Sequence, residues 1–306
     1  MNSLYKAVKD YIEMRRALGY KMARTAVLLP QFVKFLRQQG SSVITIPLAL
    51  QWAQNNRQAQ PAEWAQRLTI VRCFARHWSA TDPRTQIPPW SLLPHRPKRA
   101  RPYLYSDEEV HRLLEAARGL GGLRGLTYYC FFGLLCVTGM RLGEALNLRP
   151  ENVDLLAGVL TVRGAKFGKS RLVPIHASTQ RVFSEYVRFR DRTFNRQLFY
   201  FFVSKRGNRL DGGEVHRTFY KLSRQIGLRG PTDSHGPRLH DFRHRLAVRT
   251  LVQWYRSGRD VERRLPVLST FLGHAHVSDT YWYLTACPEL MGLAVKRLEK
   301  HWERQS

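Results

Sequence analysis

The sequence has 306 residues and carries 50 Lys and Arg against 23 Asp and Glu, which gives a formal net charge of +27. Hydrophobic residues make up 43 % of the chain, which excludes a disordered protein and suffices for two domains with separate cores. So large a basic excess in a globular chain indicates a polyanionic partner, most often nucleic acid. The alternatives are a ribosomal or chromatin protein, or a basic enzyme without such a partner.

The four cysteines show no metal-binding or disulfide pattern. Cys73, Cys130, Cys136 and Cys287 form no CxxC pair, and no His stands at zinc-finger spacing from them. We interpret them as reduced, mostly buried thiols of a cytoplasmic protein. The sequence has no signal peptide, and no uncharged apolar run approaches the roughly 18 residues that cross a bilayer, so we expect no membrane partner.

Helical periodicity predicts a compact four-helix domain in residues 1–80. Its helices are expected at residues 2–18 and 23–39, with a third starting at Pro47 and a fourth at Pro61. Each basic residue on these helices alone is read as a solvated charge, but together they could lie along DNA phosphates. The candidates for phosphate contact are Arg15, Arg16, Lys21, Arg24, Arg67, Arg72 and Arg76.

Residues 81–103 are predicted to form an extended linker, because proline interrupts regular structure and this segment holds six of them. The segment also carries four basic side chains that could contact DNA, Arg96, Lys98, Arg99 and Arg101. A stiff basic linker between two basic domains suits a clamp around a duplex.

A second domain is predicted from residue 104 to 306. A capping box at Ser106 starts its first helix, and the apolar stretch that follows is read as a buried core helix. That stretch ends at Arg141, and a new short helix carries Glu144. An arginine at the base of a buried helix is costly unless it is paired or binds an anion. At this point the sequence leaves two alternatives open: Arg141 forms a buried salt bridge with Glu144, or it binds an anion.

Residues 158–163 and 171–175 alternate as strands do, and the glycine-containing loop between them carries Lys166 and Lys169. Helices are predicted at 178–193, at 212–226 and from Pro288 onward, and the run LFYFFVS is read as a strand or as a buried segment. The fold class is therefore mainly α, with a helical amino-terminal domain and an α+β second domain that contains a small antiparallel sheet.

Residues 239–255 have the apolar spacing of a helix, and His240, Arg243 and His244 share one face near its start. This arrangement suits an anion, above all a phosphate. Cleavage of a phosphodiester requires a nucleophile, neutralisation of the phosphate charge and a proton for the leaving oxygen. Arg141 and Arg243 form the natural pair of phosphate ligands, because a guanidinium binds two phosphate oxygens and stays charged.

The nucleophile is predicted to be a tyrosine. The spacing of His240 and His244 superficially resembles a zinc-protease helix, but Arg243 would place a cation beside the metal, so we expect no metal and no other cofactor. Tyr281 and Tyr283 follow His274 closely, and a covalent phosphotyrosine retains the bond energy for religation without ATP.

The segments TGMRLGE, AKFGKSRLVP, HDFRH and LGH, with a tyrosine nine residues after the LGH histidine, together resemble the tyrosine recombinase (phage integrase) family. The match covers the whole second domain, and the first domain resembles that family's core-binding domain. Each motif is short, but all of them in the family's order are specific. The resemblance implies a catalytic set of Arg141, Lys166, His240, Arg243, His274 and Tyr283, supported by Glu144. Tyr281, two residues early, is expected to pack.

The resemblance also implies the chemistry of strand exchange. Tyr283 would attack the scissile phosphate, forming a 3′-phosphotyrosyl link and freeing a 5′-hydroxyl. Lys166 would protonate the leaving oxygen, and His240 would assist proton transfer at the tyrosine. The non-bridging oxygens would be held by Arg141, Arg243 and His274. Family members act as tetramers on two duplexes through a Holliday junction, without metal or nucleotide.

The carboxy-terminal helix, residues 288–303, resembles the family's exchanged tail, with an apolar stripe of Leu290, Leu293, Ala294 and Leu298 that would dock on a neighbouring subunit. The alternative is that this helix folds back on its own domain. Since the chain starts directly in the helical domain, we expect no arm-binding module before it.

The charged run before LGH and the sequence after it resemble recombinases of transposon-type mobile elements, which act alone or beside sister recombinases. The expected partner is thus double-stranded DNA at element ends, and the expected location is the nucleoid of a bacterial cytoplasm. The competing functions are a type IB topoisomerase and a catalytically inactive accessory DNA-binding protein.

Overall fold

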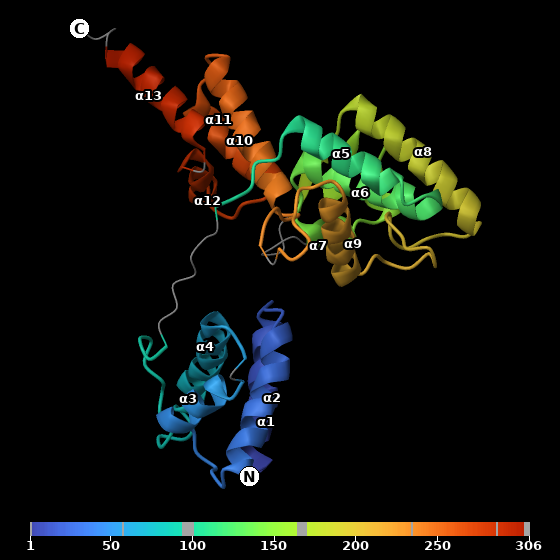
Figure 1. The fold of residues 1–306 in the computed structure, drawn as a ribbon. Coiled ribbons are helices and arrows are strands. Elements are labelled where there is room, and N and C mark those ends of the chain that lie inside the picture. Colours follow the sequence, from blue (N-terminus) through green and yellow to red (C-terminus); the bar gives the residue numbers. More distant parts are fainter. Residues whose placement is uncertain are drawn as a thin grey trace. The chain divides into compact units, whose positions relative to one another are not determined.

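The computed structural model divides into two units, Met1–Ala100 and Arg101–Ser306 (Figure 1), and each unit has a hydrophobic core of its own. The residues that the structure describes are 2–56, 58–93, 101–163, 170–233, 235–285 and 287–302. In this part of the chain, no helix has both the length and the apolar character needed to cross a bilayer.

The first unit contains the four predicted helices, and these predictions are confirmed. They are α1 (Asn2–Ala17), α2 (Ala23–Gln38), α3 (Ile46–Gln54) and α4 (Pro61–Trp78). The Thr45 hydroxyl accepts a hydrogen bond from the Leu48 amide at the start of α3, and proline occupies the first turn of both α3 and α4, where its missing amide costs nothing. Phe32, Leu36 and Phe74 are fully buried in the core between the helices.

The chain stays attached to this unit beyond α4. The guanidinium of Arg72 donates from Nε to the Pro88 carbonyl (2.8 Å) and from Nη2 to the Pro89 carbonyl (2.9 Å). Leu92 and Leu93 pack, partly buried, against the core. The part of the predicted linker up to residue 93 therefore packs on the first unit, held by the guanidinium of Arg72 and by the apolar contacts of Leu92 and Leu93.

The second unit combines helices with one three-stranded sheet. Its first elements are α5 (Asp107–Arg118), α6 (Gly122–Thr138), α7 (Leu142–Leu146), η1 (Pro150–Asn152), β1 (Val153–Asp154), β2 (Val159–Val162), β3 (Arg171–Pro174) and α8 (Ala177–Phe194). They are followed by α9 (Gly212–Gln225), α10 (Asp241–Arg256), α11 (Val261–Leu272), α12 (Ser278–Tyr281), η3 (Trp282–Thr285) and α13 (Pro288–Trp302). The described chain is thus mostly helical with a small antiparallel sheet, as predicted.

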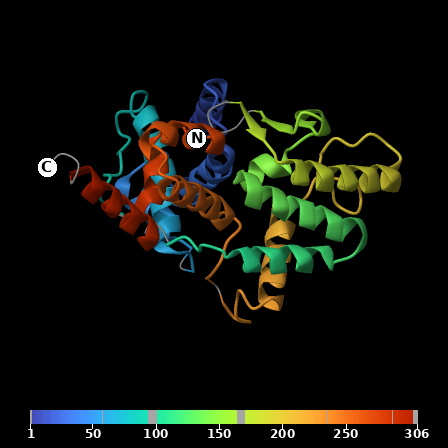
Figure 2. The same cartoon turned by 90° about the horizontal axis from the view of Figure 1, so that it is seen from above.

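Helix α6 is the centre of the second unit and packs against α5, α8 and α10 (Figures 1 and 2). Phe131, Phe132 and Leu134 are fully buried in it, so the reading as a core helix is confirmed. The predicted capping box at the start of α5 is also present, formed by Ser106 and Glu109. These contacts fix the carboxyl end of α6, where Arg141 follows.

The sheet has the strand order β1-β2-β3, with both pairs antiparallel. The hairpin of β2 and β3 confirms the two predicted strands, and Leu160 pairs with Val173 in its register. The loop between them, which carries Lys166 and Lys169, lies outside the described residues. The run LFYFFVS forms no strand, since only Val203 makes an isolated bridge, to Arg209. Most of its apolar side chains are buried, but Phe199 is 58 % exposed.

Two carboxy-terminal helices differ from what was expected. The charged stretch after α10 contains α11, where the Asp260 side chain caps the first turn and Leu265 and Leu268 are buried. Helix α13 forms where its periodicity predicted a helix. It was expected to dock on a neighbouring subunit, but it packs against α10 of its own unit, and Leu290 is only 1 % exposed. Arg297 donates to the Arg259 carbonyl (2.9 Å), so the helix adopts the folded-back alternative.

Candidate active site

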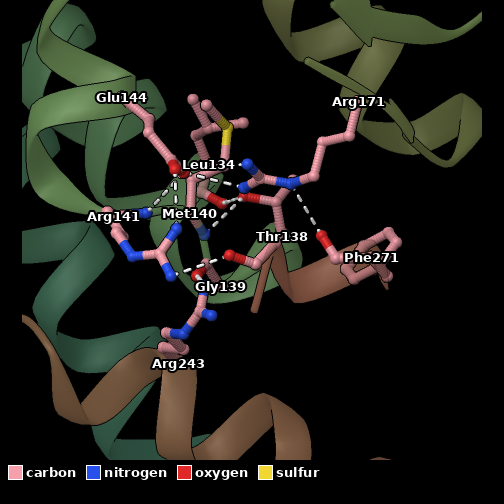
Figure 3. A network of polar contacts seen from close by, with 10 residues as sticks. Leu134, Thr138, Gly139, Met140, Arg141, Glu144, Arg171, Arg243 and Phe271 are labelled. Carbon is pink, nitrogen blue, oxygen red and sulfur yellow. Dashed lines mark hydrogen bonds and ion pairs between the residues drawn. The ribbon is translucent and has the colours of Figure 1, made fainter. Parts of the chain in front are cut away.

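Arg141 lies where α6 ends and α7 begins. The chain reverses at Gly139, which has a left-handed φ of 59°, and Arg141 then donates from Nη1 to Glu144 Oε1 (3.0 Å) and from Nη2 to the Gly273 carbonyl (2.8 Å) (Figure 3). The salt bridge considered from the sequence thus exists. The side chain nevertheless stays 29 % exposed. Since a guanidinium has five N–H donors, Arg141 can hold these anchors and still bind an anion.

Glu144 binds two arginines. Its side chain is 9 % exposed and accepts hydrogen bonds from Arg141 and from both terminal nitrogens of Arg171, at 3.2 and 2.7 Å. Burial alone would raise the pKa of Glu144, but the hydrogen bonds from Arg171 and Arg141 outweigh it and lower the pKa below its ordinary value. The carboxylate therefore stays ionised at neutral pH, as its expected supporting role requires.

Arg243, in the first turn of α10, is the most deeply buried charge of the site. The residue is only 2 % exposed, and its Nη1 donates a hydrogen bond to the Gly139 carbonyl (2.9 Å) (Figure 3). Nη2 is buried and has no hydrogen-bond partner among the described residues. Burial lowers the pKa of Arg243, while the nearby Tyr283 hydroxyl acts in the opposite direction. An unpaired buried donor is costly, so this nitrogen is suited to an incoming anion.

His240, directly before α10, and His244, on α10, lie side by side, as the shared helix face predicted. The rings of His240 and His244 meet edge to face, with centroids 5.0 Å apart. Partial burial and then the charge of Arg243 lower the pKa of His240. His244 is buried against Tyr283, with ring centroids 5.3 Å apart, and burial, followed by the charge of His240, lowers its pKa to about 4. Both rings are therefore neutral near pH 7.

His274 lies just after the end of α11 and stacks on Tyr283, with ring centroids 5.8 Å apart and an interplanar angle of 19°. Its Nδ1 lies 2.7 Å from the Thr280 hydroxyl oxygen. Burial, and then the charges of Arg243 and Arg141, lower its pKa to about 4. When the Thr280 hydroxyl donates to Nδ1, the other ring nitrogen carries the proton and can donate to a phosphate oxygen.

Tyr283 lies in η3 and is 3 % exposed, whereas Tyr281 at the end of α12 is 54 % exposed. Tyr283 contacts the rings of His244, His274 and Trp282. The expectation that Tyr281 packs is wrong, because the short helix turns its side chain to solvent and points Tyr283 inward. The structure thus places five of the predicted site residues close together within a single chain. They are Arg141, His240, Arg243, His274 and Tyr283.

The DNA-contact candidates of the first unit divide into exposed and engaged side chains. Arg16, Lys21 and Arg76 are exposed. The others have partners: Arg15 lies over the Tyr20 ring, Arg24 pairs with Glu63, Arg67 stacks on Trp52 and donates to its carbonyl, and Arg72 is 5 % exposed. A phosphate contact by Arg72 is therefore wrong, because its guanidinium is buried against the two proline carbonyls.

Several candidates cannot be placed. Lys166, Lys169, Arg96, Lys98 and Arg99 lie outside the described residues, while Arg101 is described and exposed. In the described ranges, no group of three His, Cys, Asp or Glu side chains is arranged to hold a metal ion.

Three supporting residues were not identified from the sequence. Arg171 is one arginine among many and its strand position gives no sign of burial. Gly139 and Gly273 act through their carbonyl oxygens, which accept from Arg243 and Arg141. Backbone acceptors have no sequence signature, although glycine at the end of a predicted helix does indicate a left-handed turn.

Comparison with known proteins agrees with this geometry. A model of the phage integrase family matches residues 104–289. A Sinorhizobium fredii protein named as integrase/recombinase y4rB is 58 % identical over 311 residues, which covers 99 % of each chain. Among solved structures, the Tn1549 transposon integrase in complex with transposon right end DNA is similar with a TM-score of 0.65 and 15 % identity, covering 96 % of this chain and 98 % of that one. A lambda integrase tetramer bound to a Holliday junction is similar in fold with a TM-score of 0.58 and 16 % identity, covering 89 % and 77 %. The chain therefore belongs to the phage integrase family, the tyrosine recombinases.

Proposed function

We propose that this protein is a site-specific DNA recombinase that cuts and rejoins DNA through a covalent 3′-phosphotyrosyl bond on Tyr283. One observation carries the proposal: within a single chain, the Tyr283 ring is stacked on His274 and lies beside Arg243, whose buried Nη2 lacks a partner among the described residues. A phosphate placed there would satisfy that donor and meet the tyrosine hydroxyl at once.

In this proposal, the phosphate is bound by Arg141, Arg243 and His274. Each arginine is fixed by a glycine carbonyl and keeps further N–H donors for the non-bridging oxygens. His274 is neutral near pH 7 and adds a hydrogen bond. Donors that are already in place before the charge on the phosphate develops lower the barrier without reorganising.

The proton movements follow the same residues. As the bond from the Tyr283 oxygen to phosphorus forms, the tyrosine gives up its proton, and His240, neutral because its pKa is lowered, can assist that transfer. The bond from phosphorus to the 5′-oxygen breaks, and Lys166, by its match to the family lysine, protonates the leaving oxygen. Religation reverses both steps, so no ATP, metal or other cofactor is consumed.

The wider role is integration or excision of a mobile element. This is supported by the likeness to y4rB, named as an integrase/recombinase, and by the fold shared with a transposon integrase on transposon DNA. The basic first unit, with Arg16, Lys21 and Arg76 exposed, supplies positive charge for a duplex. Strand exchange between two duplexes would pass through a Holliday junction in a homotetramer, with or without sister recombinases.

Assembly would use the face of α13 that its own unit leaves uncovered. Leu290 of the predicted stripe is buried in cis, whereas Met291 and Val295, one turn apart, are 49 % and 48 % exposed. We propose that these two apolar side chains contact a second copy of this chain in the tetramer, for which the shared fold with a tetrameric integrase on a Holliday junction is the support.

The test uses nicked duplexes from both borders of the element that carries the gene, so that cleavage traps the protein on DNA. A covalent band on a denaturing gel is expected with the unaltered protein and with Tyr281→Phe, and none with Tyr283→Phe. A band that persists in Tyr283→Phe would show that the nucleophile is misassigned. DNA binding without any band would favour the inactive accessory protein, and plasmid relaxation by a monomer would favour the topoisomerase.

A further inference from the structure

We propose that Arg171 is a positioning residue that holds Arg141 and the segment of His274 in register, so that both reach the same phosphate. The proposal rests on the proposed function, because it states how that phosphate site is aligned. Arg171 does not face the phosphate itself, since its side chain is 8 % exposed and Nε, Nη1 and Nη2 all donate to protein oxygens.

The first link runs from Arg171 to Arg141 through Glu144. Arg171 donates to both carboxylate oxygens, at 3.2 and 2.7 Å. The same carboxylate accepts from the Arg141 amide and from Arg141 Nη1, each at 3.0 Å (Figure 3). The Glu144 carboxylate thus binds two guanidinium groups, that of Arg171, which only supports it, and that of Arg141, which faces the proposed phosphate site. Without Arg171, the Glu144 side chain could rotate, and Arg141 would shift with it.

The second link runs from Arg171 to the end of α11. Nε donates to the Phe271 carbonyl (2.9 Å), two residues before Gly273. Gly273 lies directly against the Arg171 guanidinium, since a Cβ built on it would be 2.6 Å from Nη1. The Gly273 carbonyl in turn accepts from Arg141 Nη2 (2.8 Å), and His274 is the next residue. Arg171 therefore lies behind both phosphate ligands at once.

These contacts join three segments that are far apart in the sequence. Arg171 opens β3, and its partners lie 27 residues earlier on α7 and 100 residues later on α11. A lysine could keep one ion pair with Glu144, but its single ammonium cannot match both carboxylate oxygens and the Phe271 carbonyl in one plane. The planar fork of arginine is what sets the mutual orientation, and a misplacement of about 1 Å at a catalytic group can cost about 100-fold in rate.

The experiment compares Arg171→Gln and Arg171→Lys with Arg181→Gln, a matched variant at an exposed position of α8. We measure DNA affinity and the single-turnover rate of covalent complex formation at saturating nicked duplex. Expected are an affinity within about twofold of the unaltered protein and a cleavage rate lower by about 100-fold in Arg171→Gln. Arg171→Lys should be intermediate, and Arg181→Gln should cleave normally.

Two further measurements separate positioning from general damage. Arg171→Gln combined with Arg141→Lys should be slower than Arg141→Lys by clearly less than the loss caused by Arg171→Gln alone, because the part of the defect that passes through Arg141 is already present; losses that multiply in full would overturn the proposal. A duplex with sulfur in place of the bridging 5′-oxygen, whose leaving group needs no proton, should leave the defect in place. Full rescue by sulfur would overturn the proposal by showing that Arg171 acts on leaving-group protonation.

Folding and function are controlled in the same series. Thermal melting curves establish that the variants are folded, and if Arg171→Gln is not, Arg171→Lys carries the comparison because it retains the charge. Normal cleavage by both Arg171 variants, with adducts formed by the unaltered protein and absent in Tyr283→Phe, would overturn this inference alone. Absence of an adduct with the unaltered protein would overturn the proposed function and this inference together.

Discussion

Replacing Gly273 by alanine tests the contact on which the alignment of the site depends. Gly273 has a φ of 72°, and an added Cβ would lie 2.6 Å from Arg171 Nη1. The backbone would be strained and the Arg171 guanidinium would be displaced. Gly227 is a suitable control, because it also lies near the end of a helix, has a φ of 75° and would place its Cβ in open space.

The expected magnitudes follow from those two terms. Left-handed backbone costs a non-glycine residue about 1 kcal/mol, and this is the whole effect expected for Gly227→Ala. In Gly273→Ala the displaced Arg171 also loses one charged hydrogen bond, worth about 1.5–3 kcal/mol, so the total is about 2.5–4 kcal/mol. Since about 1 kcal/mol shifts the Tm of a unit of this size by about 2–4 °C, we expect about 2–4 °C for Gly227→Ala and roughly two to four times that for Gly273→Ala.

Calorimetry of the second unit and the adduct assay give the two readouts. Gly227→Ala should cleave at the normal rate, whereas Gly273→Ala should cleave more slowly by an order of magnitude or more, because its carbonyl also holds Arg141. Equal melting temperatures and equal cleavage rates in the two variants would refute the reasoning. Such a result would mean that Arg171 moves aside without affecting its neighbours.

Two other predictions rest on single side chains. The pKa of His244 and of His274 is about 4 in the folded chain and about 6.5 in the unfolded chain, so the unfolded chain binds more protons between these two pH values. The free energy of unfolding should therefore fall as the pH drops from about 6.5 to 4, by up to about 1.4 kcal/mol per pH unit for each group. Melting curves across this range should show a shallower decline in His244→Phe, and an unchanged slope would count against a neutral buried His244. In the first unit, Arg72→Gln should lower thermal stability, while Arg76→Ala should weaken DNA binding in a salt-dependent way without affecting melting; the reverse pattern in the two assays would contradict these roles.

The candidate site residues could be named from the sequence because phosphodiester chemistry restricts their types and the family resemblance supplies their order. Arg141, Arg243, His274 and Tyr283 lie on four different segments, and the structure brings these segments together at the end of α6. Tyr283 could be preferred over Tyr281 as the expected nucleophile because its spacing from His274 resembles that of the family. Its burial between two imidazoles could not be predicted, since that depends on the turn from α12 into η3.

The supporting contacts could not be predicted, for physical reasons that differ from case to case. Arg171 and Arg72 are chemically the same as the exposed arginines around them, and only the packed structure shows that carbonyl and carboxylate oxygens surround them. Helix α11 was not predicted from the sequence, because its exposed side is highly charged and Pro266 lies inside it, although its leucines have helical spacing. The run LFYFFVS has strand composition, but its buried side chains pack in the core without a strand partner along its length.

The two arginines proposed to bind the phosphate are anchored on main-chain oxygens, Arg141 on that of Gly273 and Arg243 on that of Gly139. Every amino acid has such an oxygen, so no exchange of the residues that carry it removes the acceptor atom. What moves it is a change in loop length or strain at the glycine that carries it, because Gly139 and Gly273 both have a positive φ. We therefore expect homologues to keep both glycines and the residue spacing from Gly139 to Arg141 and from Gly273 to His274, while the composition of the residues around them drifts. Attempts to retarget the protein should leave these two glycines and the loop lengths unchanged.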